Sequence, residues 1–172
     1  MSKQKYNNWK EQQVIRTLTD NGFAVTPSTE EEDCKFDIDV WVNNEPVSIK
    51  SPTHKSVCFH RRITLEYQVQ FPDGHWEDSW FRTGQARKYL FNLDGKLWLV
   101  DKEALGHFVN RHSAQPGVVK WRKLNAETKR KQRKRGHPHH DAVTANVSIP
   151  ELKKRGLLKY VGELGGKVDW KV

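Results

Sequence analysis

The sequence reads Phe36-Asp37-Ile38-Asp39-Val40-Trp41-Val42, and then Pro46-Val47-Ser48-Ile49-Lys50, in the part that decides the expected fold. In a β-strand, successive side chains point to opposite faces. The first run therefore places its apolar side chains on one face and both aspartates on the other. In the second run, Ser48 and Lys50 project from the face opposite the apolar residues. The turn-forming residues 43–46 predict a β-hairpin that brings Lys50 beside Asp37.

Two carboxylates and a lysine in this arrangement indicate phosphodiester chemistry. Carboxylate oxygens are ligands for hard cations such as Mg²⁺, and a lysine can orient or activate a water molecule. A solvated strand face also carries Asp and Lys without any such role. The remainder of the chain favours the chemical interpretation.

Length and composition predict a single α/β domain with an appendage. The chain has 172 residues, of which 35% are hydrophobic, with seven Trp and seven Phe to build a core. No apolar run approaches the roughly 20 residues of a membrane helix, and the polar start lacks a secretory pattern, so we expect a cytoplasmic protein without a membrane partner. Cys34 and Cys58 show no metal-ligand spacing and are expected to be reduced thiols.

Charge divides the chain into two parts. Residues 1–112 contain 15 Lys and Arg against 16 Asp and Glu, whereas residues 113–172 contain 15 against 5. This asymmetry predicts a folded core over residues 1–112 and a basic nucleic-acid-binding extension over residues 113–172. A merely solubilising tail is the alternative interpretation.

Apolar periodicity predicts the remaining elements. Helices are expected over residues 8–20, 83–91, 101–109 and 150–160, the third with Asp101 as its N-cap. Strands are expected over residues 23–25, 36–42, 46–50, 61–70, 96–100 and 118–121, with a polar loop over residues 26–35. This order is typical of an α/β fold with a central mixed β-sheet flanked by helices.

The predicted order of elements is a helix with a glutamate, a strand with an aspartate, a hairpin, and a strand that ends in a lysine. This order resembles the PD-(D/E)xK nuclease superfamily. The resemblance covers roughly residues 8–110, and residues 80–91 leading into 97–100 are similar to small phage and junction-resolving members. It implies a restriction-endonuclease-like core, with Asp37 as the metal-binding aspartate and Lys50 as the motif lysine. Glu11 would match the glutamate that many members carry on the first helix.

Ser48 departs from the pattern, because the superfamily has Glu or Asp two residues before the lysine. Serine is a neutral and weaker ligand for Mg²⁺. Asp39 could contribute a carboxylate from the same face as Asp37, or Glu66 could reach across from the neighbouring strand, and we favour Glu66. The expected metal ligands are therefore Asp37, Glu66 and Asp39, and the expected catalytic residues are Asp37, Lys50, Glu66 and Glu11.

The resemblance implies a Mg²⁺-dependent DNA endonuclease, with Mn²⁺ able to substitute, that acts on branched or otherwise structured DNA. Members of this superfamily often cut both strands as homodimers, so a homodimer is expected by resemblance. If neither acid replaces the missing one, the chain would be a catalytically inactive DNA-binding or accessory protein on a nuclease fold. An RNA-directed role is a further alternative.

The basic third of the chain supplies the expected phosphate contacts. They come from a basic run and a histidine cluster: Lys129, Arg130, Lys131, Arg133, Lys134, Arg135, His137, His139 and His140. Such side chains neutralise backbone charge without reading base sequence. The histidines together with Asp141 could also bind a transition metal or act as a general base, although a phosphate-binding loop is favoured.

Overall fold

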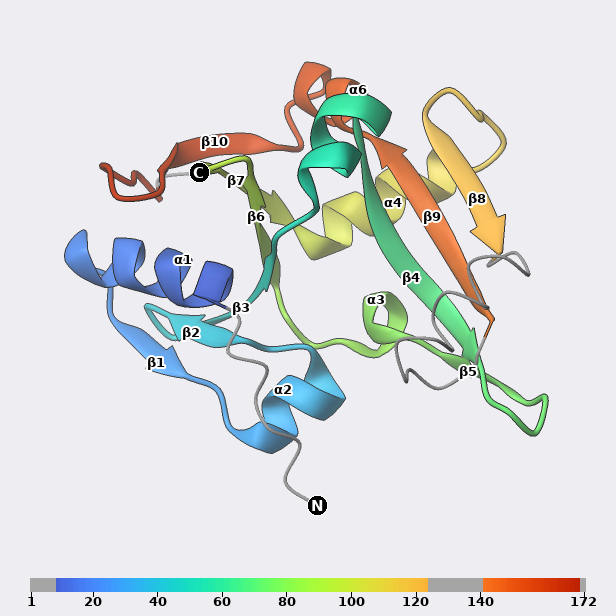
Figure 1. Ribbon diagram of the computed structural model, residues 1–172, viewed down its shortest axis with the longest axis horizontal. Coiled ribbons are helices and arrows are strands. Elements are labelled where there is room, and N and C mark those ends of the chain that lie inside the picture. The colour runs from blue at the N-terminus through green and yellow to red at the C-terminus, as the bar shows by residue number, and fades with distance from the viewer. Residues whose placement is uncertain (1–8, 124–140, 171–172) are drawn as a thin grey trace.

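The computed structural model describes residues 9–123 and 141–170. Helices and strands alternate along this part of the chain (Figure 1). The helical elements are α1 (Trp9–Asp20), α2 (Glu30–Phe36), the π-helix η1 (Lys55–His60), α3 (Trp80–Thr83), α4 (Lys102–Arg111) and α6 (Ile149–Lys154). The strands are β1 (Val25–Pro27), β2 (Val40–Val42), β3 (Glu45–Lys50), β4 (Arg62–Gln70), β5 (Trp76–Asp78), β6 (Lys88–Leu93), β7 (Lys96–Asp101), β8 (Val119–Lys123), β9 (Ala142–Ser148) and β10 (Lys159–Glu163).

The strands form two sheets. The larger has the order β1-β2-β3-β6-β7-β10 and is mixed, because β3 and β6 are parallel whereas the other neighbours are antiparallel. The smaller has the order β5-β4-β9-β8 and is antiparallel throughout. The chain is therefore a mixed α/β protein whose central sheet is flanked by helices, as expected from the sequence.

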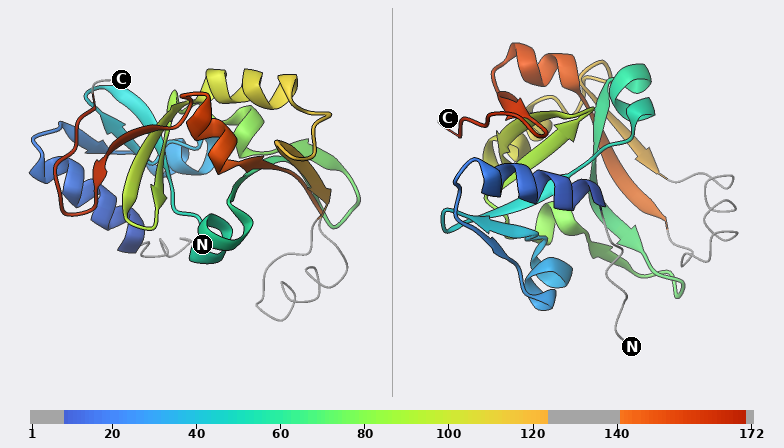
Figure 2. Two further views of the ribbon diagram at one scale, coloured as in Figure 1. Left: turned by 90° about the horizontal axis from the view of Figure 1, so that it is seen from above. Right: turned by 60° about the vertical axis from the view of Figure 1, so that its left-hand side comes forward.

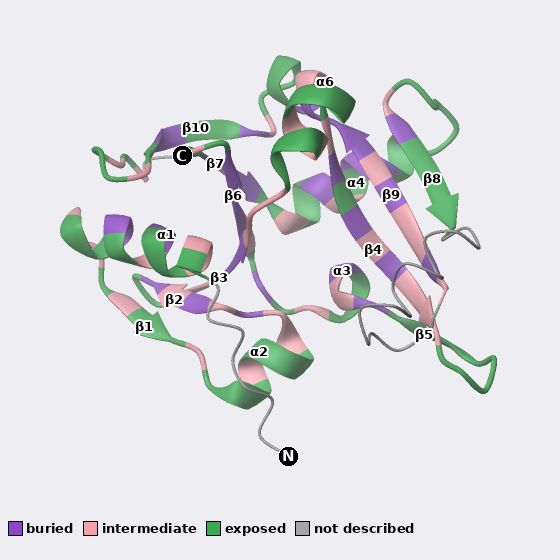
Figure 3. Cartoon of the chain, in the orientation of Figure 1, coloured by how far each residue is buried: buried purple, intermediate pink, exposed green. Residues whose placement is uncertain are grey.

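Two apolar clusters lie on opposite faces of the larger sheet. Alternate residues of β6 show this directly, because Leu90 packs with α1 while Tyr89 and Phe91 pack with α4 and the smaller sheet. Figure 2 shows α1 and α4 on opposite sides of this sheet. In Figure 3 the buried residues run along the central strands β6 and β7. The charged residues of the predicted site, Asp37, Asp39 and Lys50, therefore lie at the border of a well-buried sheet.

The hairpin that joins β2 to β3 confirms the prediction from its turn residues. Val42 pairs with Glu45, and both Asn43 and Asn44 have positive φ angles of 49° and 64°. Two consecutive residues of positive φ are the signature of a type I′ turn, which asparagine tolerates. Val47 and Ile49 face the α1 side, as predicted, and Ser48 lies on the other.

The strand expected over residues 36–42 is shorter than predicted. Residues 30–36 form α2, and Asp37 is its C-cap in the left-handed conformation (φ 52°, ψ 41°). A capping box between Thr29 and Glu32, followed by an acidic first turn, stabilises this helix in the segment that was predicted to be a loop. The prediction that Asp37 and Asp39 alternate with apolar residues along one strand is therefore wrong.

The helix expected over residues 83–91 is also wrong. A single turn, α3, ends at Gly84, and residues 88–93 form β6. Strand β6 is buried on both faces, so its near-continuous apolar run has no period of two and resembles a helix segment. The strand predicted over residues 23–25 begins two residues later, and the helix predicted over residues 150–160 ends at Lys154.

The segment after residue 112 contributes to both sheets. Strand β9, which was not predicted, pairs with β4 along its length, and β10 pairs with β7. The boundary expected at residue 112 therefore corresponds to no break in either sheet. None of the helices within residues 9–123 and 141–170 is both long enough and apolar enough to cross a membrane.

Candidate active site

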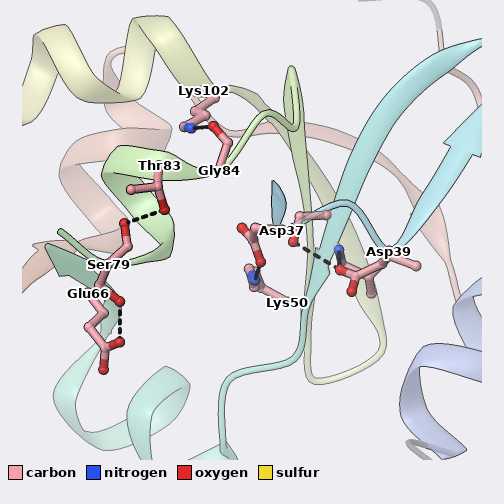
Figure 4. Close-up of polar contacts among 10 residues, drawn as sticks. Asp37, Asp39, Lys50, Glu66, Ser79, Thr83, Gly84 and Lys102 are labelled. Carbon is pink, nitrogen blue, oxygen red and sulfur yellow. Dashed lines mark hydrogen bonds and ion pairs between the residues drawn. The ribbon is translucent and has the colours of Figure 1, made fainter. Parts of the chain in front are cut away.

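An ion pair between Lys50 and Asp37 forms the centre of the candidate site. Lys50 lies at the end of β3, Asp37 caps α2, and the hairpin places the two side by side (Figure 4). Lys50 Nζ is 2.6 Å from Asp37 Oδ1, and their side chains are only 23% and 13% exposed. The predicted contact is thus present, although it is the left-handed cap and not strand alternation that turns Asp37 toward the lysine.

Asp39 lies on the other side of Ser48. Its Oδ2 accepts hydrogen bonds from the Ser48 hydroxyl at 2.9 Å and from the Ile49 backbone N–H at 2.5 Å. Ser48 is fully buried, and its hydroxyl lowers the pKa of both Asp37 and Asp39. Ser48 therefore positions the carboxylate of Asp39 and lies close to that of Asp37.

Burial raises the pKa of Asp37 and of Asp39 above the ordinary aspartate value. The Lys50 ammonium opposes this shift at both residues, and the two carboxylates repel each other's charge at Asp39. Burial thus outweighs the attraction of Lys50 at both acids, and a further positive charge at this place would lower the pKa of each.

Aromatic rings hold the lysine in place. Lys50 Nζ lies 4.3 Å from the ring centroid of Trp80 and 5.8 Å from that of Tyr89. These distances are within the range of cation–π attraction. The lysine is therefore fixed by a carboxylate on one side and by aromatic faces on the other.

One oxygen of Asp37 has no hydrogen-bond partner among the described residues. This atom, Oδ2, is buried, and so is the Tyr89 hydroxyl, which also lacks a partner there. Burial raises the pKa of Tyr89 well above its usual range, and the Asp37 carboxylate raises it further through its charge and through its polar contact with the Tyr89 hydroxyl, a contact that falls short of hydrogen-bond geometry. A buried unpaired acceptor is costly unless a water molecule or an ion satisfies it.

Gly84 allows α3 to approach Asp37 closely. A Cβ at this position would lie 3.0 Å from Asp37 Cβ and 2.5 Å from the Trp80 carbonyl oxygen. Lys102 Nζ donates a hydrogen bond to the Gly84 carbonyl, and its charge lowers the pKa of Asp37. A second lysine thus lies close to the acidic pair from the start of α4.

The structure does not bring Glu66 into this group. Its Oε1 accepts a hydrogen bond from the Ser79 hydroxyl, at the N-terminus of α3, and Figure 4 shows this pair apart from Asp37 and Lys50. Of the two candidates for the missing acid, Asp39 is the one that lies beside Ser48. Glu11 lies in the first turn of α1 and is partly buried, and α1 packs against β1 and β3.

A basic cleft on the smaller sheet was not predicted. Its lining contains four basic side chains and no carboxylate: it comprises Ser56, His60, Arg62, Thr64, Pro116, Lys120, Arg122 and Asn146. Arg62 donates hydrogen bonds to the carbonyl oxygens of Asn146, Pro116 and Gly117, which fixes its guanidinium group. The alternation of basic residues along β8 was the signal that could have revealed this surface.

The predicted phosphate contacts of the basic run, Lys129 to Arg135, and of His137, His139 and His140 lie outside the described residues. In sequence they fall between β8, an edge strand of the smaller sheet, and its neighbour β9. The two cysteines are free, as predicted, and both are exposed. Cys58, however, lies beside His54 and Asp94, a proximity that its position in the sequence did not suggest.

Comparison of the chain with family models gave no match, and comparisons with curated proteins and with solved structures gave none either.

Proposed function

We propose that the chain is a Mg²⁺-dependent endonuclease of DNA, with Asp37, Asp39 and Lys50 at its active site. The observation that carries this proposal is a pair of largely buried carboxylates on the two sides of the end of β3, where Lys50 pairs with Asp37 and Ser48 donates to Asp39. The order of α1, the β2–β3 hairpin and the parallel β3–β6 pair supports a restriction-endonuclease-like core. Mn²⁺ is expected to replace Mg²⁺.

The residues present fit a divalent cation. Asp37 Oδ2 and the Asp39 carboxylate would hold it, and its charge would offset the burial that raises the pKa of each acid. When bound, Mg²⁺ supplies Lewis-acid polarisation of a phosphate and a lowered pKa for a bound water. Glu66 is not needed for this arrangement. Asp39 takes the role of second metal-binding acid that was expected of Glu66.

Lys50 would position the phosphate or the attacking water. Its ammonium has three donors, of which one is directed to Asp37, and the Trp80 face limits its movement. A preorganised cation beside a phosphate stabilises the charge that develops in the transition state. Lys102, half-buried next to Gly84, adds positive charge on the other side of Asp37.

The basic cleft supports nucleic acid as the partner. Arg62, Thr64 and Glu66 alternate with the buried residues of β4, so the cleft and Glu66 share one face of the smaller sheet. Lys120 and Arg122 are exposed on the neighbouring surface. Phosphate contacts of this kind supply affinity that falls steeply with salt and carry no base sequence.

A second candidate function follows from Ser48. Its neutral hydroxyl occupies the place of an acid and satisfies Asp39 Oδ2 without any metal. A protein built in this way could bind DNA as an accessory factor without cutting it. Metal-dependent cleavage separates the two functions.

The test is cleavage of supercoiled plasmid and of a branched DNA junction with Mg²⁺, with Mn²⁺ and with EDTA. The endonuclease is expected to cut in both metals and not in EDTA, and Lys50→Ala and Asp37→Ala are each expected to abolish cutting while leaving DNA binding largely intact. Lys35→Ala is the matched control, because Lys35 pairs with Glu31 on the exposed surface of α2. Binding without cutting under any metal would favour the accessory function, and full cutting by both site variants would exclude the assigned centre. A competition between DNA and RNA of equal length decides which nucleic acid is preferred.

A further inference from the structure

Three metal-binding side chains meet on the surface, separate from the acidic pair. His54 precedes η1, Cys58 lies within it, and Asp94 lies in the turn between β6 and β7. Cys58 Sγ is 3.0 Å from Asp94 Oδ2 and 3.6 Å from His54 Nδ1, and the last two atoms are 2.9 Å apart. All three residues are exposed, so an ion could enter directly from solvent.

Local structure places each of these ligands. His54 already has helical φ and ψ angles, so His54 and Cys58, four residues apart, project from the same side of one helical turn. Asp94 and Gly95 both have positive φ angles, 53° and 86°, which form a tight hairpin turn and hold the carboxylate at the end of the larger sheet. The triad thus joins two segments that are 36 residues apart in sequence.

The triangle of ligand atoms is close to the size that tetrahedral zinc requires. With Zn–S near 2.3 Å and Zn–N or Zn–O near 2.0 Å, tetrahedral geometry separates sulfur from nitrogen or oxygen by about 3.5 Å, and nitrogen from oxygen by about 3.3 Å. The observed sulfur–nitrogen distance of 3.6 Å matches this value. The two contacts of Asp94 are a few tenths of an ångström shorter, as expected for hydrogen bonds that an ion would replace.

We propose that His54, Cys58 and Asp94 form a zinc-binding site with a fourth position open to water or to an external ligand. A thiolate and an imidazole favour Zn²⁺ over the hard cation expected at Asp37. Binding requires a deprotonated sulfur, so the Cys58 proton leaves to solvent as the Zn–S bond forms, and the imidazole binds in its neutral form.

The bound ion would fasten η1 to the larger sheet. None of the side chains of η1 is buried, and its hydrogen bonds to the β6–β7 turn come from this triad. Because η1 follows β3 directly and precedes β4, it connects Lys50 to the strand that carries Arg62. Zinc at this point would therefore fix the segment between the acidic pair and the basic cleft.

The test uses Co²⁺ as a spectroscopic substitute for Zn²⁺ on the reduced full-length chain without an affinity tag. We expect a thiolate-to-cobalt charge-transfer band that saturates at one thiolate-bound Co²⁺ per chain, and displacement of that ion by Zn²⁺. Cys58→Ala is expected to abolish the band, whereas Cys34→Ala, which removes the other exposed thiol, is expected to retain it. His54→Ala and Asp94→Asn are each expected to weaken Co²⁺ binding by at least about tenfold. Loss of a residue that only supports a metal ligand already weakens metal binding by about this factor, and loss of a ligand should cost no less.

A second measurement keeps the proposal independent of the spectrum. Zn²⁺ is expected to slow alkylation of Cys58 while leaving alkylation of Cys34 unchanged in the same molecule. An absent charge-transfer band, a band lost only in Cys34→Ala, or equal alkylation of both thiols with Zn²⁺ would overturn the proposal. So would Co²⁺ bound without a thiolate band, as the histidines of residues 137–140 alone would give. None of these readouts uses nucleic acid, so failure here leaves the proposed nuclease function untouched.

Discussion

Lys50 Nζ lies 2.6 Å from Asp37 Oδ1, and this one ammonium group is the charged partner of a carboxylate that is mostly removed from solvent. The same ammonium covers the Trp80 ring and lowers the pKa of Asp39 as well as that of Asp37. The stability of the fold and the chemistry of the site therefore both depend on the Lys50 ammonium. Substitutions can separate these two effects.

Lys50→Met is expected to destabilise the fold near pH 7. The substitution keeps the apolar stem but leaves Asp37 buried without its partner, which costs about 1–3 kcal/mol in the free energy of unfolding. The loss should shrink as the pH falls and Asp37 becomes protonated. Urea unfolding at several pH values measures it. Lys35→Met, which breaks the exposed pair with Glu31, should cost less than about 1 kcal/mol, and equal losses in the two variants would contradict the assignment.

Asp39→Asn is expected to be neutral or stabilising at pH 7. The wild-type pKa of Asp39 is raised, so the folded state binds more protons than the unfolded state between the ordinary value of 3.8 and the raised value. Stability contributed by this group is therefore greatest at low pH and falls as the pH rises through that window. Asparagine retains an oxygen for Ser48 and Ile49 but has no charge, so its contribution to stability is not lost above the window.

Urea unfolding of wild type and Asp39→Asn across the acidic range tests this prediction. The two curves of unfolding free energy against pH should diverge as the pH rises. Curves that stay parallel would show that the ionisation of Asp39 has no linkage to folding.

Mg²⁺ is expected to stabilise the wild-type chain against heat but not Asp37→Asn or Asp39→Asn. A ligand that binds only the folded state stabilises it by about 2.7 kcal/mol at a concentration 100 times its dissociation constant. Thermal unfolding with and without Mg²⁺ measures this effect. Glu103→Gln, which removes an exposed acid from α4, is the control and should respond as wild type does. Equal stabilisation of all four proteins would place the bound metal elsewhere.

Gly84→Ala is expected to damage the site, whereas Gly106→Ala is expected to leave it intact. A Cβ at Gly84 would clash with the Trp80 carbonyl oxygen of α3 and crowd Asp37 Cβ, at a cost of about 1–3 kcal/mol, and cleavage should be lost as this contact is displaced. A Cβ at Gly106, inside α4, meets nothing within 4 Å and should stabilise the helix by about 0.5–1 kcal/mol. Denaturation midpoints and cleavage rates of the two variants provide the comparison. A Gly84→Ala protein with wild-type cleavage would show that the close approach is unimportant.

Replacing both Lys120 and Arg122 by alanine is expected to weaken DNA binding and to reduce its dependence on salt. Each phosphate contact that is lost lowers the slope of log K against log salt by about 0.9 for duplex DNA. Binding measured over a series of salt concentrations gives this slope. The control removes two exposed lysines elsewhere, Lys35 and Lys159, and so changes the net charge equally. If the control lowers the slope as much as the cleft variant does, the cleft is not the binding surface.

The hairpin and its lysine could be predicted from sequence because each depends on neighbours in the chain. The turn residues Asn43 and Asn44 and the alternation of residues 47–50 determine where Lys50 points. The position of Asp37 could not be read in the same way, since a capping box at Thr29 creates a helix that ends in a left-handed residue. The contact with Lys50 was therefore predicted, although the conformation that makes it was not.

The misplaced residues depend on tertiary contacts. Glu66 was assigned to the site on the expectation that its strand neighbours the one that carries Lys50, but β4 pairs with β9 in a separate sheet, and the Ser79 hydroxyl donates a hydrogen bond to its carboxylate. Strand β6 was predicted as a helix because it is buried on both faces, which removes the two-residue period. The partner of β4 in the smaller sheet lies far away in sequence, and so does β3, the parallel neighbour that helps to bury β6.

The parallel pairing of β3 with β6 has a consequence for the order of folding. Two parallel neighbours need a long connection, and here that connection carries η1, β4, β5 and α3. Strand β4 can complete its sheet only when β9 is present, as the contact between Arg62 and Asn146, which are 84 residues apart, illustrates. Asp37 and Lys50, in contrast, are separated by only 13 residues. Since non-local contacts form late and slowly, the pairing of Asp37 with Lys50 can form early in synthesis, but the surface proposed to hold the nucleic acid is completed only after β9 has been made.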